Sequence, residues 1–237
     1  MVKIMLEQIT NVLKFIQTTL IYIVYPPICP VCEEIVDERH KLCENCAKEI
    51  IKLDEEKFIP APISGVMRVT KYRNGTRRLL RALKFDCNTN VLAALQSILY
   101  GVSNSPEIEN FLANVNLATY VPLHEKRLKK RGYNQTELIF KDWLTSKNIP
   151  AENLLIRTKA TPHLYSYNPA ERKEILKGAF SLAEGVNVRG KNILIVDDIF
   201  TTGATAAGCA EVLKNAGAAK IFMLAFASDF GELRTKD

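Results

Sequence analysis

The chain has 237 residues, of which 47% are hydrophobic and 24% are charged. This composition can bury a core, which excludes a mainly disordered chain, and the length suits one ordinary domain with a small module. Residues 1–60 hold 7 basic against 10 acidic residues, a net charge of −3, whereas residues 61–237 hold 25 against 16, a net charge of +9. We expect a small module over 1–60 and a basic domain over 61–237, which favours an anionic partner.

The first 25 residues carry apolar side chains every three or four positions, which predicts an amphipathic helix that ends before Pro26. Because its polar face has few basic residues, we expect it to dock on the body of the chain or on a partner rather than on a membrane surface. No apolar run here is long enough for a transmembrane segment, and no signal cleavage site follows. These features favour a cytoplasmic protein.

Four of the six cysteines form two close pairs, Cys29 with Cys32 and Cys43 with Cys46, separated by ten residues. Two short chelating turns joined by a spacer are typical of a structural zinc site with four thiolate ligands. Two disulfides are the alternative, and they would require an oxidising compartment. His40 is a further candidate ligand. A zinc ion held by four sulfurs has no open coordination position, so we expect it to stabilise structure and perform no chemistry.

From residue 65 onward, strand and helix patterns alternate, which predicts a parallel α/β sheet flanked by helices. The residues between 158 and 176 lack clear periodicity, and we expect a functional loop there. We also expect a loop over 102–109. The predicted strands are 65–72, 117–122, 154–157, 180–183, 192–196 and 220–227, and the predicted helices are 76–85, 91–100, 134–146 and 204–216.

The segment from Ile193 to Thr205 combines a buried apolar strand, two adjacent carboxylates and a small-residue turn into a helix. Asp197 and Asp198 follow the apolar run, at the strand end where open α/β sheets bind ligands. The turn after them offers backbone N–H groups and hydroxyls at a helix N-terminus, which suits a phosphate. A simple capped helix after a core strand is the alternative. A P-loop is excluded, because no Gly-Lys-Ser/Thr sequence occurs.

This segment closely resembles the phosphoribosyl-diphosphate (PRPP) signature of type I phosphoribosyltransferases, apart from Phe200, where a smaller aliphatic residue is usual. The resemblance implies a type I phosphoribosyltransferase fold. It implies that Asp197 and Asp198 hold the ribose hydroxyls, with Mg²⁺ bridging them to the diphosphate. It further implies that five residues wrap the 5′-phosphate: Thr201, Thr202, Gly203, Ala204 and Thr205.

Further motifs narrow the resemblance to the ComF family of competence-associated proteins, over nearly the whole chain from about Tyr25. They are the four-cysteine knuckle, Val121-Pro122-Leu123, Arg131-Gly-Tyr-Asn-Gln135, Glu171-Arg172 and Gly178-Ala-Phe180. The resemblance implies a role in DNA uptake during natural transformation, alongside other DNA-uptake proteins, with incoming single-stranded DNA handled on the cytoplasmic side. His163 and Ile175 depart from the family, which has Gln and Asn there, and both lie in the segment that would cover PRPP.

If the chain is a transferase, Pro122 and Leu123 would form the diphosphate loop, and Arg131 or Arg172 would approach the leaving group. The catalytic set would then be Asp197, Asp198, Arg131 and Arg172. The acceptor, a nitrogen nucleophile, is not indicated by any motif. A nucleobase-salvage phosphoribosyltransferase and a non-catalytic nucleic-acid-binding scaffold are the alternatives.

Two basic clusters favour single-stranded DNA as a partner, because cations interleaved with aromatic residues suit phosphates and stacked bases. They span residues 68–84 and 126–131, with Tyr72, Phe85 and Tyr133 within or beside them. A surface that only steers the diphosphate is the alternative. The candidate contacts are Arg77, Arg81, Lys84, Lys126, Lys129 and Lys130.

Overall fold

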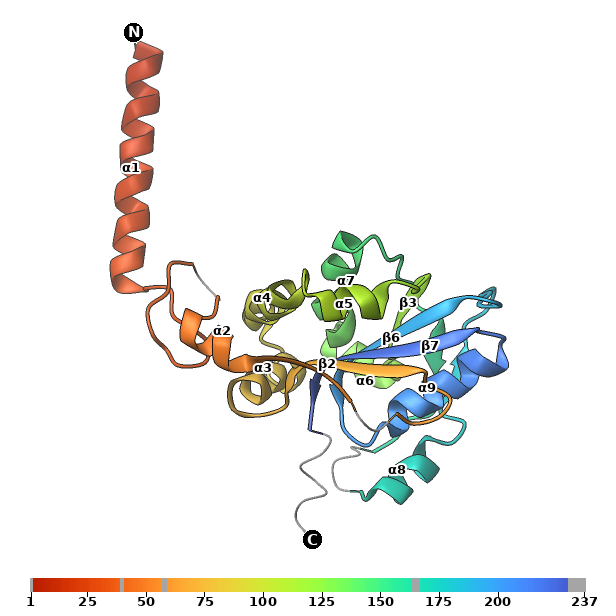
Figure 1. Cartoon of the computed structure of the whole chain (residues 1–237). Helices are drawn as coiled ribbons and strands as arrows, with labels where there is room; N and C mark the ends of the chain where they lie inside the picture. The colour runs from red at the N-terminus through yellow and green to blue at the C-terminus, as the bar shows by residue number, and fades with distance from the viewer. Residues whose placement is uncertain (1, 39–40, 57–58, 163–166, 230–237) are drawn as a thin grey trace.

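A mostly parallel sheet organises the computed structural model, which describes residues 2–38, 41–56, 59–162 and 167–229 (Figure 1). The sheet has five strands in the order β1-β2-β7-β6-β3, and every neighbouring pair except β1 with β2 is parallel. The predicted parallel α/β class is therefore confirmed. The strands are β1 (Ile51–Glu55), β2 (Gly65–Lys71), β3 (Leu117–Tyr120), β6 (Asn192–Phe200) and β7 (Lys220–Ser228).

Helices cover both faces of the sheet because the central strands are apolar on both sides. Along β6, Leu194 and Val196 join one core cluster, while Ile193 and Ile195 join the other, as the two-residue period of a strand requires. The first cluster packs under α3 (Asn74–Phe85), α4 (Leu92–Val102) and α7 (Gln135–Ser146), with the short η1 (Thr89–Val91) before α4. The second packs under α9 (Ala204–Asn215) and the hairpin of β4 (Leu155–Arg157) and β5 (Phe180–Leu182).

The first strand is an addition to the expected elements. Residues 51–55 follow α2 (Glu44–Ile50) and pair antiparallel with β2, with Ile51 opposite Thr70. In this strand Ile51 and Leu53 are half-buried while Lys52 and Asp54 are exposed, so only two apolar positions mark it. The strand belongs to the acidic segment 1–60 and completes the sheet of the basic body. The domain boundary at residue 60 stays a prediction.

Two expected loops contain helices. The loop predicted over 102–109 is wrong, because α5 (Pro106–Leu112) begins there, and the segment 158–176 contains α8 (Pro169–Leu176). Both helices have proline in the first turn after a polar cap: Ser105 accepts from the Ile108 N–H, and Asn168 forms a capping box with Glu171. Proline is favoured at the first helical position. In these segments proline marks a helix start and not a loop. The basic segment after β3 also forms a helix, α6 (Glu125–Arg131).

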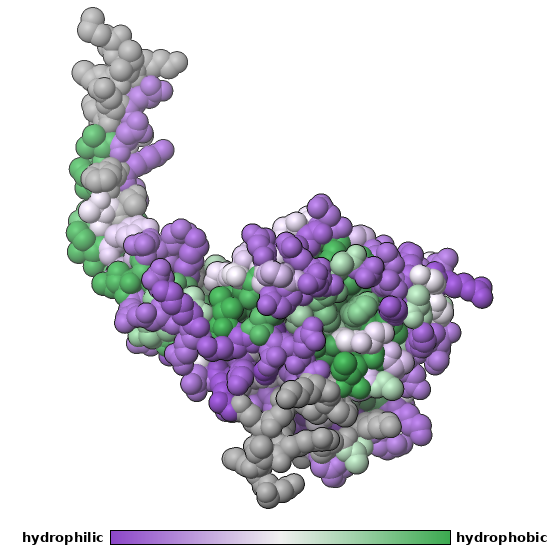
Figure 2. Space-filling view, viewed as in Figure 1, coloured by the Kyte–Doolittle hydropathy of each residue, from purple (hydrophilic) through white to green (hydrophobic). Residues whose placement is uncertain are grey.

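The predicted N-terminal helix is confirmed as α1 (Val2–Val24). It does not dock on the body of the chain, and docking on a partner, the other expectation, stays a prediction. The helix projects away from the sheet, beyond the cysteine-containing segment (Figure 1). Leu20 is 56% exposed and Ile23 is 71% exposed. Figure 2 shows hydrophobic side chains along one side of this helix and around its base. Among the helices of the described chain, none combines the length and apolar character needed to cross a bilayer.

Candidate functional site

The four paired cysteines converge on one point beside α2. Their sulfur atoms all lie within 4.8 Å of one another, and Cys32 Sγ lies 3.5 Å from Cys43 Sγ. Thiolates arranged tetrahedrally at about 2.3 Å from zinc are about 3.8 Å apart, so the spacing fits that ion. All four are free thiols in the structure, and Cys43 also caps α2 by accepting from the Cys46 N–H. His40 lies outside the described residues.

The acid pair lies inside β6 and not beyond its end, which corrects the predicted strand over 192–196. Pairing with β7 continues through Phe200 opposite Ser228, whereas pairing with β3 stops at Val196 opposite Tyr120. Asp197 and Asp198 therefore lie where β6 has a partner on one side only. Both are nevertheless buried, at 9% and 2% exposure. This open side of the strand is the floor of the candidate site.

The two carboxylates have different partners. Asp197 Oδ1 accepts a 2.8 Å hydrogen bond from the Asp198 N–H, and the Thr136 hydroxyl of α7 lies 3.5 Å from it. Asp198 Oδ2 lies 2.6 Å from the Lys84 ammonium of α3. Burial raises the pKa of Asp197 well above its ordinary value, and the neighbouring Asp198 charge raises it further, while Lys84 opposes both effects. In the ligand-free site, burial therefore favours the protonated form of Asp197.

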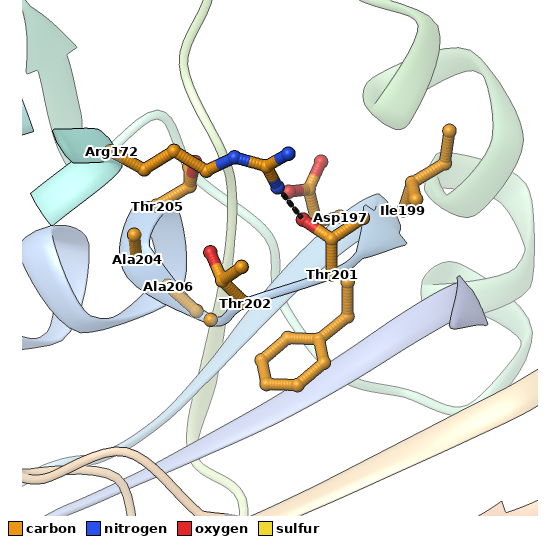
Figure 3. A pocket seen from close by; sticks show the side chains of 10 residues that line it. Arg172, Asp197, Ile199, Thr201, Thr202, Ala204, Thr205 and Ala206 are labelled. Carbon is orange, nitrogen blue, oxygen red and sulfur yellow. Dashed lines mark hydrogen bonds between the residues drawn. The ribbon is translucent and has the colours of Figure 1, made fainter. Parts of the chain in front are cut away.

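The turn after β6 forms a small pocket with Asp197. Gly203 has φ +74, a left-handed conformation, and caps α9; a Cβ there would lie 2.9 Å from Pro60 Cγ and 3.0 Å from the Phe200 ring. Phe200, the residue that departs from the signature, is buried behind this turn. In Figure 3 the Arg172 side chain reaches across from α8 and donates a 3.1 Å hydrogen bond to the Thr201 hydroxyl. The pocket lining includes Asp197 and all five residues from Thr201 to Thr205.

A larger cavity of about 260 Å³ adjoins this turn, and several of the site residues predicted from the sequence line it. Its walls carry both carboxylates, Lys84, Leu123, Arg131 and Arg172. Pro122 lies between Val121 and Leu123, which both line the cavity. Arg131 also contacts the side chain of Gln135, another residue of this wall. The structure thus brings the proposed ribose, phosphate and diphosphate segments to one cavity.

Two further arginines line this cavity, although the sequence does not predict either of them as a site residue. Arg127 of α6 donates to the Thr161 carbonyl at 2.6 Å, and Arg157, which is 7% exposed, contacts the Thr161 hydroxyl and stacks near the Phe180 ring. The Arg157 Nε has no hydrogen-bond partner in the part of the chain that the structure describes. Arg127 belongs to the second basic cluster of the sequence. No sequence motif predicts Arg157 as a site residue, because the β4–β5 hairpin sets its position.

The predicted DNA contacts divide between the surface and the cavity. Arg77 and Arg81 are exposed on α3, and the Arg81 guanidinium lies 5.3 Å from the centre of the Phe85 ring, which is 53% exposed. Lys84, on the same helix, faces the cavity instead. Lys126, Lys129 and Lys130 are exposed on α6, where Lys129 pairs with Glu125.

The two family departures can be placed only in part. Ile175 is half-buried on α8, and His163 lies outside the described residues.

Comparisons with known proteins match the cysteine-containing segment to a zinc-binding family and match most of the chain to named relatives. A family model described as a double zinc ribbon domain matches residues 20–58, and with the four close thiols it confirms the predicted structural zinc site. The chain is 31% identical over 201 residues to the DNA utilization protein YhgH of Salmonella typhimurium, covering 82% of this chain and 87% of the relative. It is 28% identical over 197 residues to the protein of the same name from Escherichia coli K12, covering 82% and 81%.

A solved structure, the glutamine phosphoribosylpyrophosphate amidotransferase from B. subtilis, aligns with 18% identity, a TM-score of 0.41 and coverage of 62% of this chain and 30% of that chain.

Proposed function

Since the chain belongs to the ComF family, the family of the DNA utilization protein YhgH, we propose that it binds PRPP with Mg²⁺ and handles single-stranded DNA in the cytoplasm during DNA uptake. The observation that carries the PRPP proposal is that the acid pair and Arg172 line one cavity together with Thr201 and Thr205, the two ends of the ligand turn. Each of these parts suits a different group of PRPP.

The 5′-phosphate would bind at the turn from Thr201 to Thr205. Gly203 gives this turn its left-handed conformation, and the first N–H groups of α9 point out of the helix N-terminus. Such a terminus carries a partial positive charge and has unsatisfied N–H donors, which together favour a phosphate. The Arg172 guanidinium, bonded to Thr201, would add a full positive charge beside the same phosphate.

The ribose hydroxyls and Mg²⁺ would bind at the acid pair. The donor set fits, because carboxylate oxygens are hard ligands and Asp198 Oδ2 has, apart from its ion pair with Lys84, no hydrogen-bond partner among the described residues. Asp197 and Asp198 would accept hydrogen bonds from the 2′- and 3′-hydroxyls and so orient the ring. When bound there, Mg²⁺ would supply positive charge that offsets the charge of the diphosphate.

The diphosphate would lie against the arginine-rich wall behind Leu123. Arg127, Arg131, Arg157 and Arg172 all line this cavity, which otherwise has only Lys84 as a cation among the described residues. Transfer would break the bond between ribose C1 and the diphosphate oxygen while a nitrogen nucleophile forms the new bond to C1 with inversion. The arginines would stabilise the charge that the departing diphosphate takes with it. Binding of PRPP does not require the nitrogen acceptor, whereas transfer does.

Isothermal titration calorimetry of the full chain with PRPP and Mg²⁺ tests this proposal directly. We expect saturable one-to-one binding in the micromolar range, which is lost when Mg²⁺ is chelated. The matched control ligand is ribose 5-phosphate, which retains the phosphate and ribose but lacks the diphosphate, and it should bind more weakly. Absence of any PRPP binding at millimolar concentration would contradict the proposal and favour the non-catalytic scaffold.

Single-stranded DNA would bind outside the cavity, along the exposed basic faces of α3 and α6. Arg77 and Arg81 lie on the first face, and Phe85 at its end also lines the cavity. Lys126, Lys129 and Lys130 lie on the second face, while Arg127 and Arg131 of the same helix turn into the cavity. Cations with an exposed aromatic ring favour a strand whose phosphates pair with the cations and whose bases stack. The two faces would then lead a strand past the mouth of the cavity.

A further inference from the structure

The projecting helix α1 exposes its side chains along its length. Every residue of α1 whose side chain the structure describes is exposed, from Glu7 to Val24. Helices in proteins owe most of their stability to the packing of an amphipathic face and less to helix propensity. An amphipathic helix of 23 residues that stands away from the sheet therefore offers its apolar face to another chain (Figure 1).

The apolar positions of α1 follow a strict heptad repeat. Aliphatic residues recur at alternating spacings of four and three residues, which is the period of a left-handed coiled coil. With the heptad positions written a to g, every a position holds leucine, and every d position after the first holds isoleucine. The repeat runs without interruption along the helix, through Val2, Leu6, Ile9, Leu13, Ile16, Leu20 and Ile23.

The exposed apolar surface is large enough for a stable interface. Eleven large hydrophobic residues between Val12 and Ile35 are each 43% to 74% exposed, and Figure 2 shows them along one side of α1 and around its base. Such a side chain offers roughly 100 Å² when fully exposed, so the surface amounts to roughly 600 Å² per chain. With the polar residues at its rim, it approaches the roughly 800 Å² per partner that stable complexes bury.

The charges favour copies of this chain over a membrane surface as the occupant. The sequence has no charged residue between Lys14 and Glu33, whereas helices that lie on membranes carry basic residues on their polar face. In a parallel pairing of identical helices, like charges at the e and g positions beside the seam would repel. From Thr10 to Val24 these positions are uncharged, and Glu7 and Lys14 occupy b positions. Identical copies can therefore pair without opposing like charges.

We propose that α1 is a self-association helix, through which three or four copies of this chain form a parallel coiled coil. Leucine at a with isoleucine at d favours three or four strands over two in parallel coiled coils. Because α1 projects away from the sheet, the bodies of the copies would lie together at one end of this bundle (Figure 1).

Size-exclusion chromatography with light scattering on the full chain tests the proposal. We expect the original chain, of 26.7 kDa, to have three or four times that mass at micromolar concentration. Leu13→Asp combined with Leu20→Asp should give a monomer, because the seam would then bury unpaired charges. The matched control is Asn11→Asp combined with Thr18→Asp, which adds the same charges at the same spacing but at f positions, and it should keep the oligomer.

A monomeric original chain at every concentration overturns the proposal, and the apolar face would then fit a different partner. An oligomer that persists in the Leu13→Asp, Leu20→Asp variant also overturns it, because another surface would hold the copies together. Zinc content and thermal unfolding verify that the body of each variant folds.

Disulfide cross-linking tests the parallel direction. Ile23→Cys is made in a Cys87→Ser background, and mild oxidation should link copies through the introduced thiol, because d positions near one helix end meet only in a parallel bundle. The chain with Cys87→Ser alone should give no cross-link. An oligomer that forms no cross-link overturns the parallel arrangement.

Discussion

Arg78 of α3 and Glu33 of the first cysteine turn form an ion pair of 3.0 Å between two parts of the chain that are 45 residues apart. Both side chains are more than half exposed, so the pair itself contributes little stability. The pair instead shows that the first cysteine turn contacts α3. Beneath it, Gly75 approaches Val31 so closely that a Cβ would lie 2.7 Å from Val31 Cγ1. The zinc module, the segment that holds the four cysteines from Cys29 to Cys46, thus packs directly on α3.

Zinc should therefore stabilise the whole chain and not the module alone. Cys29 and Cys46 are buried in the same core cluster as Leu79 and Leu83 of α3. We expect Cys29→Ser to abolish the one equivalent of zinc per chain, measured by elemental analysis, and to lower the free energy of unfolding by an amount on the order of several kcal/mol. The control is Cys87→Ser, on an exposed cysteine outside the cluster. If Cys29→Ser loses zinc and the free energy of unfolding does not change, zinc binding does not stabilise the rest of the chain.

The acid pair should make stability depend on pH in a specific direction. The pKa of Asp197 in the folded chain is raised by burial and then by Asp198, above a value near 4 in the unfolded chain. Because the folded chain prefers the protonated form, raising the pH through the interval between these two pKa values progressively destabilises it. Asp197→Asn removes this cost and still provides an oxygen acceptor for the Asp198 N–H.

We expect Asp197→Asn to raise the free energy of unfolding at neutral pH by at least on the order of 1 kcal/mol. The gain should shrink toward about pH 4, where the original carboxyl is protonated in both states. Denaturant unfolding across this pH range measures it. A gain that is the same at every pH would mean that the substitution acts through packing. The same variant should lose Mg²⁺-dependent PRPP binding, which separates stability from function at this residue.

The central strands and the ligand turn could be predicted because their signals are local. Ile193 to Val196 form an uninterrupted apolar run, and Gly203 follows at the point where the chain must turn into α9. The strand and the turn each depend on residues within a few positions of one another along the chain. Proline is the misleading local signal, since Pro106 and Pro169 occupy first-turn positions of helices in segments whose sequence suggests loops.

Other site features depend on tertiary packing and have no local signal. Lys84 follows Arg77 and Arg81 at helical spacing, and this pattern predicts one shared basic face. Lys84 instead faces the acid pair, because packing between α3 and β6 brings residues 114 positions apart into contact. Arg157 likewise reaches the cavity only through the pairing of β4 with β5. Long-range pairings of this kind are set by the complete fold.

The turn after β6 offers a matched pair of glycine substitutions. Gly203 and Gly190 both have positive φ, of +74 and +71, but only Gly203 has neighbours where a Cβ would lie. Gly190→Ala should cost about 1 kcal/mol from backbone strain alone. Gly203→Ala should cost more, because Pro60 and the Phe200 ring must also shift, and the distorted turn should weaken PRPP binding at least about tenfold. Equal losses of stability and unchanged binding in both variants would show that the turn tolerates the displacement.

The proposed PRPP and DNA sites should be separable by substitution. Alanine at Arg77, Arg81 and Lys130 removes three exposed cations from the two proposed DNA faces and leaves the cavity lining intact. We expect this variant to bind a fluorescent single strand at least about tenfold more weakly at moderate salt. Its log–log salt dependence should become shallower by about 0.7 for each DNA phosphate that the variant no longer neutralises. PRPP binding should be retained.

The reverse pattern is expected when Asp197→Asn is combined with Asp198→Asn: PRPP binding is lost and single-strand binding is retained. The matched charge control is alanine at Lys141, Lys191 and Lys220, three exposed lysines outside α3 and α6, and it should change DNA binding little. Because it removes the same net charge, it distinguishes direct phosphate binding from general attraction. Equal weakening of DNA binding by both triple variants would contradict a site on α3 and α6. Loss of both ligands in a folded acid-pair variant would mean that strand and PRPP share one cavity.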